Sequence, residues 1–226
     1  MTFIADTDTV PDQYSWHLLN PERNLRETKE QFESLLEEFA LPERPININE
    51  YASFESGEQT PAGAVFYISQ LERYECHGLR ANWASGPLLQ DLLANLVVNE
   101  DGSYKPTGEW HVYDYYVNQM KGSRLETTAS DDELFEVYAT TADSYGTTKI
   151  LAAVRPIAGI KKYDITVTGL RECGLTGDTV KVKTWKFEGP DRFTAVGDPI
   201  DLGVVEHQIV DDKVRDTYAT TIRILC

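Results

Sequence analysis

The sequence has few cysteines, no long hydrophobic run and no basic start. Cys76, Cys173 and Cys226 are too few and too scattered for a disulfide framework or a zinc site, which leaves one disulfide or buried free thiols. No stretch approaches the ~18 consecutive apolar residues of a membrane-spanning helix. Residues 1–6 lack the basic and apolar segments of a signal peptide, and the chain opens straight into what resembles a mid-domain strand.

Basic residues are also scarce. Lys and Arg number 21 against 37 Asp and Glu, which gives a net charge of −16 and a sequence pI near 4.6. This balance argues against a nucleic-acid partner and against an anionic membrane surface. It is compatible with a neutral ligand such as a sugar, with a cation, or simply with a solubilising role. The 226 residues suffice for one large or two small domains.

Several catalytic signatures are missing. No glycine-rich phosphate loop follows a predicted strand, and no G-x-S-x-G nucleophile elbow occurs. His77, His111 and His207 have no metal-ligand spacing. The sequence therefore predicts neither a metal nor an organic cofactor.

The first half of the chain alternates short strands with helices. Strands are predicted at residues 14–19, 45–50 and 78–83. Helices are predicted to start at Asn20-Pro21, Thr60-Pro61, Ser85-Gly86-Pro87 and Thr107-Gly108. The order β-α-β-α-β-α-α is typical of parallel strands with crossover helices. Three such strands alone would leave edges unpaired and a face uncovered.

After Gly122, a natural helix stop, the pattern becomes all-β. Apolar residues alternate near positions 135–139, 150–154, 163–167, 180–184 and 220–224, with turn signals between them. This pattern predicts an antiparallel sheet or β-sandwich. We place a domain boundary near residue 123, between domains 1–122 and 123–226.

Polar and aromatic side chains end each predicted parallel strand. The first strand ends in Trp16-His17, the second in Asn49-Glu50-Tyr51 and the third in Asn82-Trp83. Ligands bind at the carboxyl ends of parallel strands, where aromatic faces and polar groups suit a sugar. Glu50 is the candidate catalytic carboxylate, unless it only caps its loop. Likewise, His17 and Trp83 could instead be packing residues.

Glycoside hydrolysis usually needs two carboxyl groups, and the other carboxylates are weaker candidates. Glu55 and Glu58 fall in the loop after Glu50, where side chains are usually solvated. Glu109 begins a helix and favours its dipole, so we interpret it as structural. Residues 131–133 predict a solvated acidic turn.

At these strand ends the chain resembles fungal (β/α)8-barrel glycoside hydrolases, most closely family 39, the β-xylosidase and iduronidase group. The matching segments are Tyr14-Ser15-Trp16-His17, Ile46-Asn47-Ile48-Asn49-Glu50-Tyr51, Glu58-Gln59-Thr60-Pro61, Gly78-Leu79-Arg80-Ala81-Asn82-Trp83 and Pro106-Thr107-Gly108-Glu109-Trp110.

The resemblance implies a partial TIM barrel, its last strands and helices, followed by a β-sandwich. It assigns Glu50 as the nucleophile of a retaining enzyme and His17 as a residue of the sugar site. The family's acid/base Glu has no counterpart here, because the chain starts near the sixth barrel strand. The expectation is a secreted glycosidase represented by its C-terminal segment, whose N-terminal half is supplied in cis or in trans.

Two rival interpretations remain open. In the first, the β-domain is a non-catalytic carbohydrate-binding or interaction module, with Trp185 and Phe193 as possible ligand aromatics. In the second, the chain is an incomplete remnant whose open sheet edge promotes association.

Overall fold

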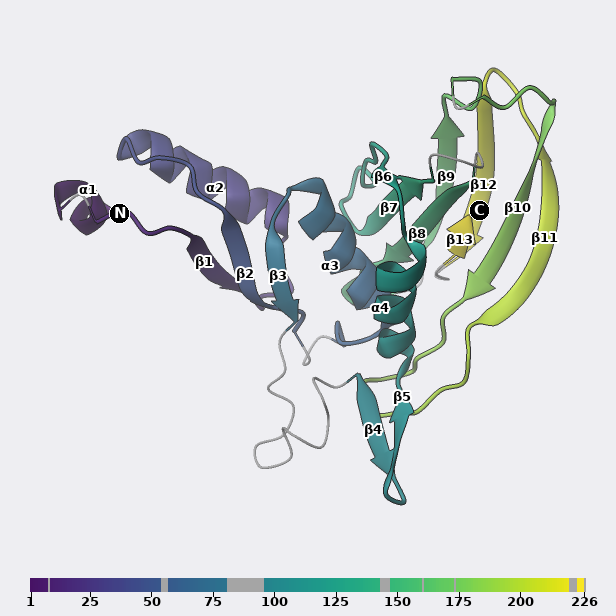
Figure 1. Cartoon of the computed structure of the whole chain (residues 1–226), viewed down its shortest axis with the longest axis horizontal. Helices are drawn as coiled ribbons and strands as arrows, with labels where there is room; N and C mark the ends of the chain where they lie inside the picture. The colour runs from purple at the N-terminus through teal and green to yellow at the C-terminus, as the bar shows by residue number, and fades with distance from the viewer. Residues whose placement is uncertain are drawn as a thin grey trace.

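The computed structural model describes residues 1–7, 9–53, 57–80, 96–142, 147–159, 161–172, 174–219 and 223–225, with side chains to residue 214. The protein is a mixed α/β structure with several sheets and few helices (Figure 1). A parallel sheet lies at one end, antiparallel strands lie at the other, and helices α3 and α4 lie between them. None of the helices in these ranges has the length and apolar character needed to cross a membrane.

The parallel sheet has three strands in the order β1-β2-β3. Strand β1 spans Tyr14–Leu18, β2 spans Ile46–Tyr51 and β3 spans His77–Arg80. Helices α2 (Leu25–Glu38) and α3 (Pro61–Arg73) connect them. The predicted parallel pairing is confirmed. A short helix, α1 (Thr2–Thr7), precedes β1 and was not predicted; it buries no side chain.

Helix α2 begins later than the sequence predicted. Asn20 caps no helix: its side chain accepts a hydrogen bond from the Glu22 amide at 2.9 Å and closes a local turn. The N-cap is Asn24, whose Oδ1 accepts from the Glu27 amide at 2.9 Å. The Asn20-Pro21 prediction was wrong because an Asn can close a turn as readily as it can cap a helix.

Replacing Asn24 with alanine is expected to lower the free energy of unfolding by about 1–2 kcal/mol, because the capping acceptor is lost. Asn24→Ser keeps a capping oxygen but, like Asn24→Ala, loses the donation from Asn24 Nδ2 to Glu133, so the serine variant should be the more stable of the two by about 1 kcal/mol. Urea denaturation followed by circular dichroism measures both. Equal stability of the two variants would show that the cap contributes nothing.

A hairpin and a helix follow the described part of β3. Strands β4 (Val97–Glu100) and β5 (Ser103–Pro106) form the hairpin, which was not predicted. Asp101 and Gly102 between them have φ values of 51° and 81°, so the Asp-Gly pair was the available signal. Helix α4 (Gly108–Gln119) starts as predicted, with Thr107 as N-cap. The predicted helix at Ser85-Gly86-Pro87 lies outside the described residues.

The rest of the chain is antiparallel. One sheet has the order β13-β8-β7-β6, from Arg223–Leu225, Thr148–Val154, Phe135–Thr141 and Ser123–Arg124. A 3-10 turn at Pro156–Ala158 follows β8. The other strands form two pairs. They are β9 (Lys162–Thr168) with β12 (Lys213–Ala219) and β10 (Thr179–Lys186) with β11 (Ile200–Gln208). Buried apolar residues of β7, β8, β9 and β10 share one cluster.

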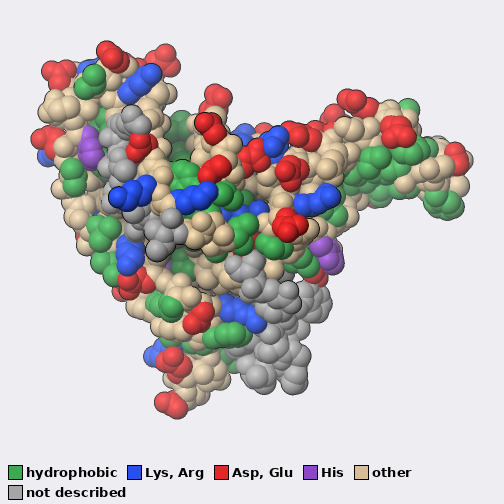
Figure 2. All heavy atoms as spheres, turned by 180° about the vertical axis from the view of Figure 1, so that it is seen from behind, with side chains coloured by type: hydrophobic (Ala, Val, Ile, Leu, Met, Phe, Trp, Pro, Cys, Tyr) green, Lys and Arg blue, Asp and Glu red, His purple; other side chains and the backbone are tan. Residues whose placement is uncertain are grey.

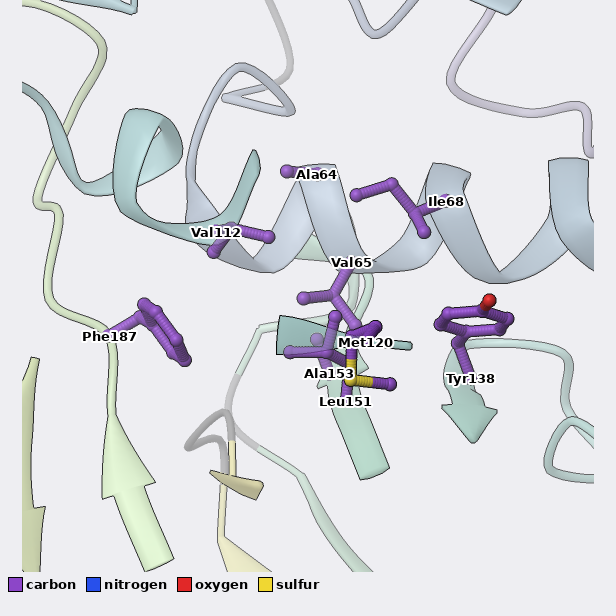
Figure 3. Packing of buried hydrophobic residues seen from close by; sticks show 9 residues of the cluster. All are labelled: Ala64, Val65, Ile68, Val112, Met120, Tyr138, Leu151, Ala153 and Phe187. Atoms are coloured by element: carbon purple, nitrogen blue, oxygen red, sulfur yellow. The ribbon is translucent and has the colours of Figure 1, made fainter. Parts of the chain in front are cut away.

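Helix α3 joins the two parts of the molecule. Its Phe66 and Tyr67 pack with β1 and β2. Its Ala64, Val65 and Ile68 pack in a second cluster with Leu151 and Ala153 of β8 (Figure 3). Helix α3 is buried on nearly all sides, so apolar residues occur all around it. This explains why its sequence is only weakly amphipathic.

Among the residues that the structure describes, helices cover only one face of the parallel sheet. Ile46, Ile48 and Tyr51 of β2 are buried against α3 on that face. The register places His17, Glu50 and Leu79 on the opposite face, where Leu79 is 62% exposed. Parallel sheets in proteins are normally covered on both faces. The uncovered face is therefore the natural place for a ligand or for further chain.

Candidate functional site

A β-bulge in strand β2 determines which way Glu50 points. The β1–β2 register pairs Trp16 with Ile48 and then His17 with Glu50, so Asn49 is the extra residue. Without the bulge, simple alternation would put Glu50 on the same face as Ile46 and Ile48, against the helices. The bulge moves Glu50 to the uncovered face at the carboxyl end of its strand.

Glu50 meets His17 on that face. The His17 Nδ1 lies 3.4 Å from Glu50 Oε2, and their side chains are 51% and 16% exposed. The carboxylate is thus held with one oxygen beside an imidazole, and the imidazole is the more solvent-exposed of the two groups. This arrangement can present a carboxylate to a ligand and hydrogen-bond the ligand from the imidazole.

The other predicted site residues do not join this pair. Trp16 lies on the helix-covered face, where its ring centroid is 5.0 Å from that of Phe32. Tyr51 is also on that face and is 4% exposed. Asn49 has a buried Oδ1 without a hydrogen-bond partner among the described residues. Asn82 and Trp83 lie outside the described residues, as does Glu55.

A buried polar network supports the strand end from the helix side. The Tyr51 and Tyr113 hydroxyls are 2.6 Å apart, which joins β2 to α4. Arg80, at the end of β3, forms a two-pronged ion pair with Glu109 in the first turn of α4. Both side chains are almost fully buried, at 6% and 1% exposure. Glu109 thus has a buried ion-pair partner that the sequence did not show.

Burial controls the titration of this network. It raises the pKa of Tyr51 to about 12, so both hydroxyls stay protonated at neutral pH and one must donate to the other. Burial also raises the pKa of Glu109, while the charge and hydrogen bonds of Arg80 oppose that rise. The hydroxyl pair and the ion pair therefore hold the ends of β2 and β3 against α4.

Tyr113→Phe is expected to lower the free energy of unfolding by about 1–2 kcal/mol, because it leaves the buried Tyr51 hydroxyl without its partner. The matched control is Tyr104→Phe, since Tyr104 is 51% exposed and its variant should be neutral. Chemical denaturation of both variants gives the comparison. Equal stabilities would remove the hydroxyl pair from the account.

Glu58 contradicts the prediction of a solvated loop side chain. It is fully buried, and its Oε1 lies 2.6 Å from Nε of Arg155, which directly follows β8. Its Oε2 accepts hydrogen bonds from the Tyr67 hydroxyl at 2.8 Å and from the Ser53 amide at 3.0 Å. The sequence gave no local signal for this, because Arg155 is 97 residues away.

The acidic run 131–133 is also more than a solvated turn. Asp132 accepts hydrogen bonds from the Tyr163 hydroxyl at 2.9 Å and from Lys161 at 3.0 Å. Glu133 forms an ion pair with Arg26 of α2. These contacts tie the segment before β7 to β9 on one side and to α2 on the other.

Other groups named from the sequence take ordinary positions. Trp185 packs at the edge of the α3–β8 cluster, with Lys183 4.5 Å from its ring centroid. Phe193 is 49% exposed and lies under Arg192. Cys76 is a half-buried free thiol, and burial raises its pKa to about 11. Cys173 and Cys226 lie outside the described residues.

Acidic side chains are prominent along the upper edge of the face seen in Figure 2, and basic side chains are interspersed among them. Hydrophobic side chains gather along the arm that ends in α1. The described residues contain no group of three or more His, Cys, Asp or Glu side chains placed to hold a metal ion.

The chain is similar to several known proteins. No known family model matches the chain. A 3-O-alpha-D-galactosyl-alpha-L-arabinofuranosidase of Bifidobacterium longum subsp. longum is 24% identical over 227 residues. That match covers 95% of this chain and 19% of the relative. The solved structure of N2152 from Neocallimastix frontalis aligns over 99% of this chain and 55% of its own, with 18% identity and a TM-score of 0.80.

An alpha-L-arabinofuranosidase from Thermotoga maritima, solved with arabinose, aligns over 99% of this chain and 54% of its own. Its identity is 12% and its TM-score is 0.60. The chain has a glycoside hydrolase-like fold. It spans about half the length of these two solved structures and about a fifth of the curated relative.

Proposed function

We propose that this chain contributes the nucleophile of a retaining glycoside hydrolase, and that Glu50 is that nucleophile. The observation that carries the proposal is the bulge at Asn49, which delivers the Glu50 carboxylate to the uncovered sheet face beside His17. Active sites of parallel α/β barrels are built at the carboxyl ends of the strands, where Glu50 lies. The glycoside hydrolase-like fold supports the same assignment.

The proposed reaction has two steps. A Glu50 oxygen attacks the anomeric carbon and the glycosidic C–O bond breaks, while a second carboxyl group protonates the departing oxygen. Water, deprotonated by that second group, then cleaves the glycosyl ester and frees Glu50. His17 hydrogen-bonds the bound sugar and steadies Glu50. These steps use no metal or organic cofactor.

The proposal includes an architecture. We take residues 1–122 as the last strands and helices of a (β/α)8 barrel and residues 123–226 as a β-sandwich packed on it. Further parallel strands and the acid/base carboxyl group would then come from more of the same polypeptide or from another chain. The helices of the described ranges cover a single face of the β1–β3 sheet, which supports this architecture.

The proposed site residues now divide by face. Glu50 and His17 contact the substrate from the open face, and Asn82 and Trp83 are proposed to continue that site beyond β3. We propose that Trp16, Asn49 and Tyr51 serve the site indirectly, by holding the ends of β1 and β2 in place. The family 39 assignment remains a prediction. The names of the relatives add arabinofuranosides to the candidate substrates.

A panel of nitrophenyl glycosides, with arabinofuranosides and xylosides included, tests the function. The chain is assayed beside a form extended upstream through its reading frame. Activity in the extended form alone is expected, because two carboxyl groups are needed. Activity in neither form would favour a non-catalytic carbohydrate-binding role. In that case, glycan binding should survive Glu50→Ala and be lost when residues 123–226 are removed.

A further inference from the structure

We propose that Arg155 is a positioning residue for Glu50, and that it acts through Glu58, which holds the backbone of Ser53 three residues after Glu50. The inference rests on the proposed function, because it assigns to the antiparallel part a role in placing the proposed nucleophile. It starts from one buried ion pair, which links Arg155 of that part to Glu58, just before helix α3.

Arg155 is fixed from every side. It precedes Pro156, which restricts its backbone to extended conformations, and its amide donates to the Leu134 carbonyl at 2.7 Å. Its guanidinium lies 4.7 Å from the ring centroid of Phe66 on α3. Its Nη1 donates to the Arg23 carbonyl, just before α2, at 2.9 Å. The Arg155 side chain thus contacts helix α3 and the segment just before helix α2, the two helices that connect the parallel strands.

The guanidinium also organises the Glu58 carboxylate. Arg155 Nε donates to Glu58 Oε1 at 2.6 Å, and Nη2 donates to the Tyr67 hydroxyl at 3.1 Å. That hydroxyl in turn donates to Glu58 Oε2. Arg155 therefore contacts Glu58 directly and through Tyr67, and both carboxylate oxygens are engaged.

Glu58 holds the backbone just after strand β2. Its carboxylate accepts from the Ser53 amide, and its own amide donates to the Ser53 carbonyl at 3.0 Å. Ala52, directly after β2, has a φ of 71°, which a residue with a Cβ holds only when its surroundings enforce it. Ser53 lies two residues after the end of β2, so its two contacts with Glu58 hold the backbone next to the strand end from which Glu50 projects.

The chain offers a matched control in a second buried ion pair. Arg73, in the last turn of α3, lies 2.6 Å from Glu136 of β7, and their side chains are 16% and 2% exposed. This pair also links α3 to the antiparallel part. It lies at the other end of the helix, about 20 Å along its axis from the end near Glu58. A purely structural role would make the two pairs equivalent.

The test compares two double variants of the 226-residue chain, Glu58→Gln/Arg155→Met and Glu136→Gln/Arg73→Met. Each removes both charges, so neither leaves an unpaired charge in the interior. The readout is the pair of imidazole cross-peaks of His17, one of four histidines, in NMR spectra of the folded proteins. Because His17 touches Glu50, these peaks report the placement of the carboxylate without any activity.

We expect the Glu58/Arg155 variant to move the His17 peaks and the Glu136/Arg73 variant to leave them in place. In an active extended protein, the same variant should lower kcat roughly 10- to 100-fold with little change in KM, because the nucleophile is misplaced. Arg155→Lys keeps the charge but loses the fork geometry, so it should move the peaks less. It replaces the double variant if that protein does not fold.

Unmoved His17 peaks in the Glu58/Arg155 variant would overturn the inference, and so would equal shifts in both double variants. Failure of the proposed function has a different signature. If Glu50→Gln keeps full activity, the nucleophile assignment falls, while the NMR comparison still decides whether Arg155 positions the end of β2.

Discussion

Glu50→Gln is expected to reduce glycoside hydrolysis on the order of 10⁴- to 10⁶-fold in the extended, active protein, as loss of a catalytic nucleophile does. An amide is a far poorer nucleophile than a carboxylate and forms no stable glycosyl intermediate. The loss should appear in kcat, since the amide has nearly the same size and still fills the same place beside His17. Initial rates on the best nitrophenyl glycoside measure the effect.

The control for this prediction is Glu43→Gln. Glu43 is exposed and precedes β2, so it shares the segment but not the strand end. Its variant should retain the parental rate. A Glu50→Gln protein that is folded and as active as the Glu43→Gln protein would refute the nucleophile assignment.

Arg155→Met is expected to lower the free energy of unfolding by about 3–5 kcal/mol, which is the usual cost of breaking a buried ion pair from one side. The Glu58 carboxylate is fully buried, so without Arg155 it would remain as an unpaired charge. Urea denaturation at neutral pH gives the difference. The Glu58→Gln/Arg155→Met protein should recover much of the loss, because no buried charge is left.

The control is an exposed pair of similar geometry. Lys186 lies 2.7 Å from Glu188, and their side chains are 41% and 50% exposed. Lys186→Met should change stability by less than about 1 kcal/mol, because water screens this pair. If Arg155→Met is as mild as Lys186→Met, the buried ion pair does not hold the two parts of the molecule together.

Local sequence signals predicted the elements that depend on local chemistry. Thr60-Pro61 and Thr107-Gly108 are helix starts in the structure, because capping and a fixed φ act within one turn. Where two local solutions compete, the prediction failed: Asn20 closes a turn and Asn24 caps the helix. The Asp101-Gly102 hairpin had a signal that was not used.

Bulges limited the prediction of strands. Strand β11 was missed because Gly203, with a φ of 87°, interrupts its alternation, and its register with β10 shifts in the same region. Its side chains are also almost all exposed, which removes the pattern that burial imposes. The bulge at Asn49 was not predicted for the same reason, since a two-residue alternation does not show where an extra residue is inserted.

The candidate site was predictable in part. The strand-end position of Glu50 and its neighbour His17 followed from the β-α-β order, because parallel strands end at the same edge. The faces taken by Trp16 and Tyr51 depended on the packing of α2 and α3, which single residues do not encode. The partner of Glu58 came from a distant strand, so only the folded structure could supply it.

The most direct measurement of the central claim is covalent trapping of the nucleophile. The extended, active protein is incubated with the 2-fluoro analogue of its best substrate, which slows hydrolysis of the glycosyl–enzyme intermediate formed by retaining enzymes. Peptide mass mapping then locates the sugar. The account predicts one adduct on Glu50 and none in the Glu50→Gln protein. An adduct on another carboxylate, with Glu50 unmodified, would contradict it.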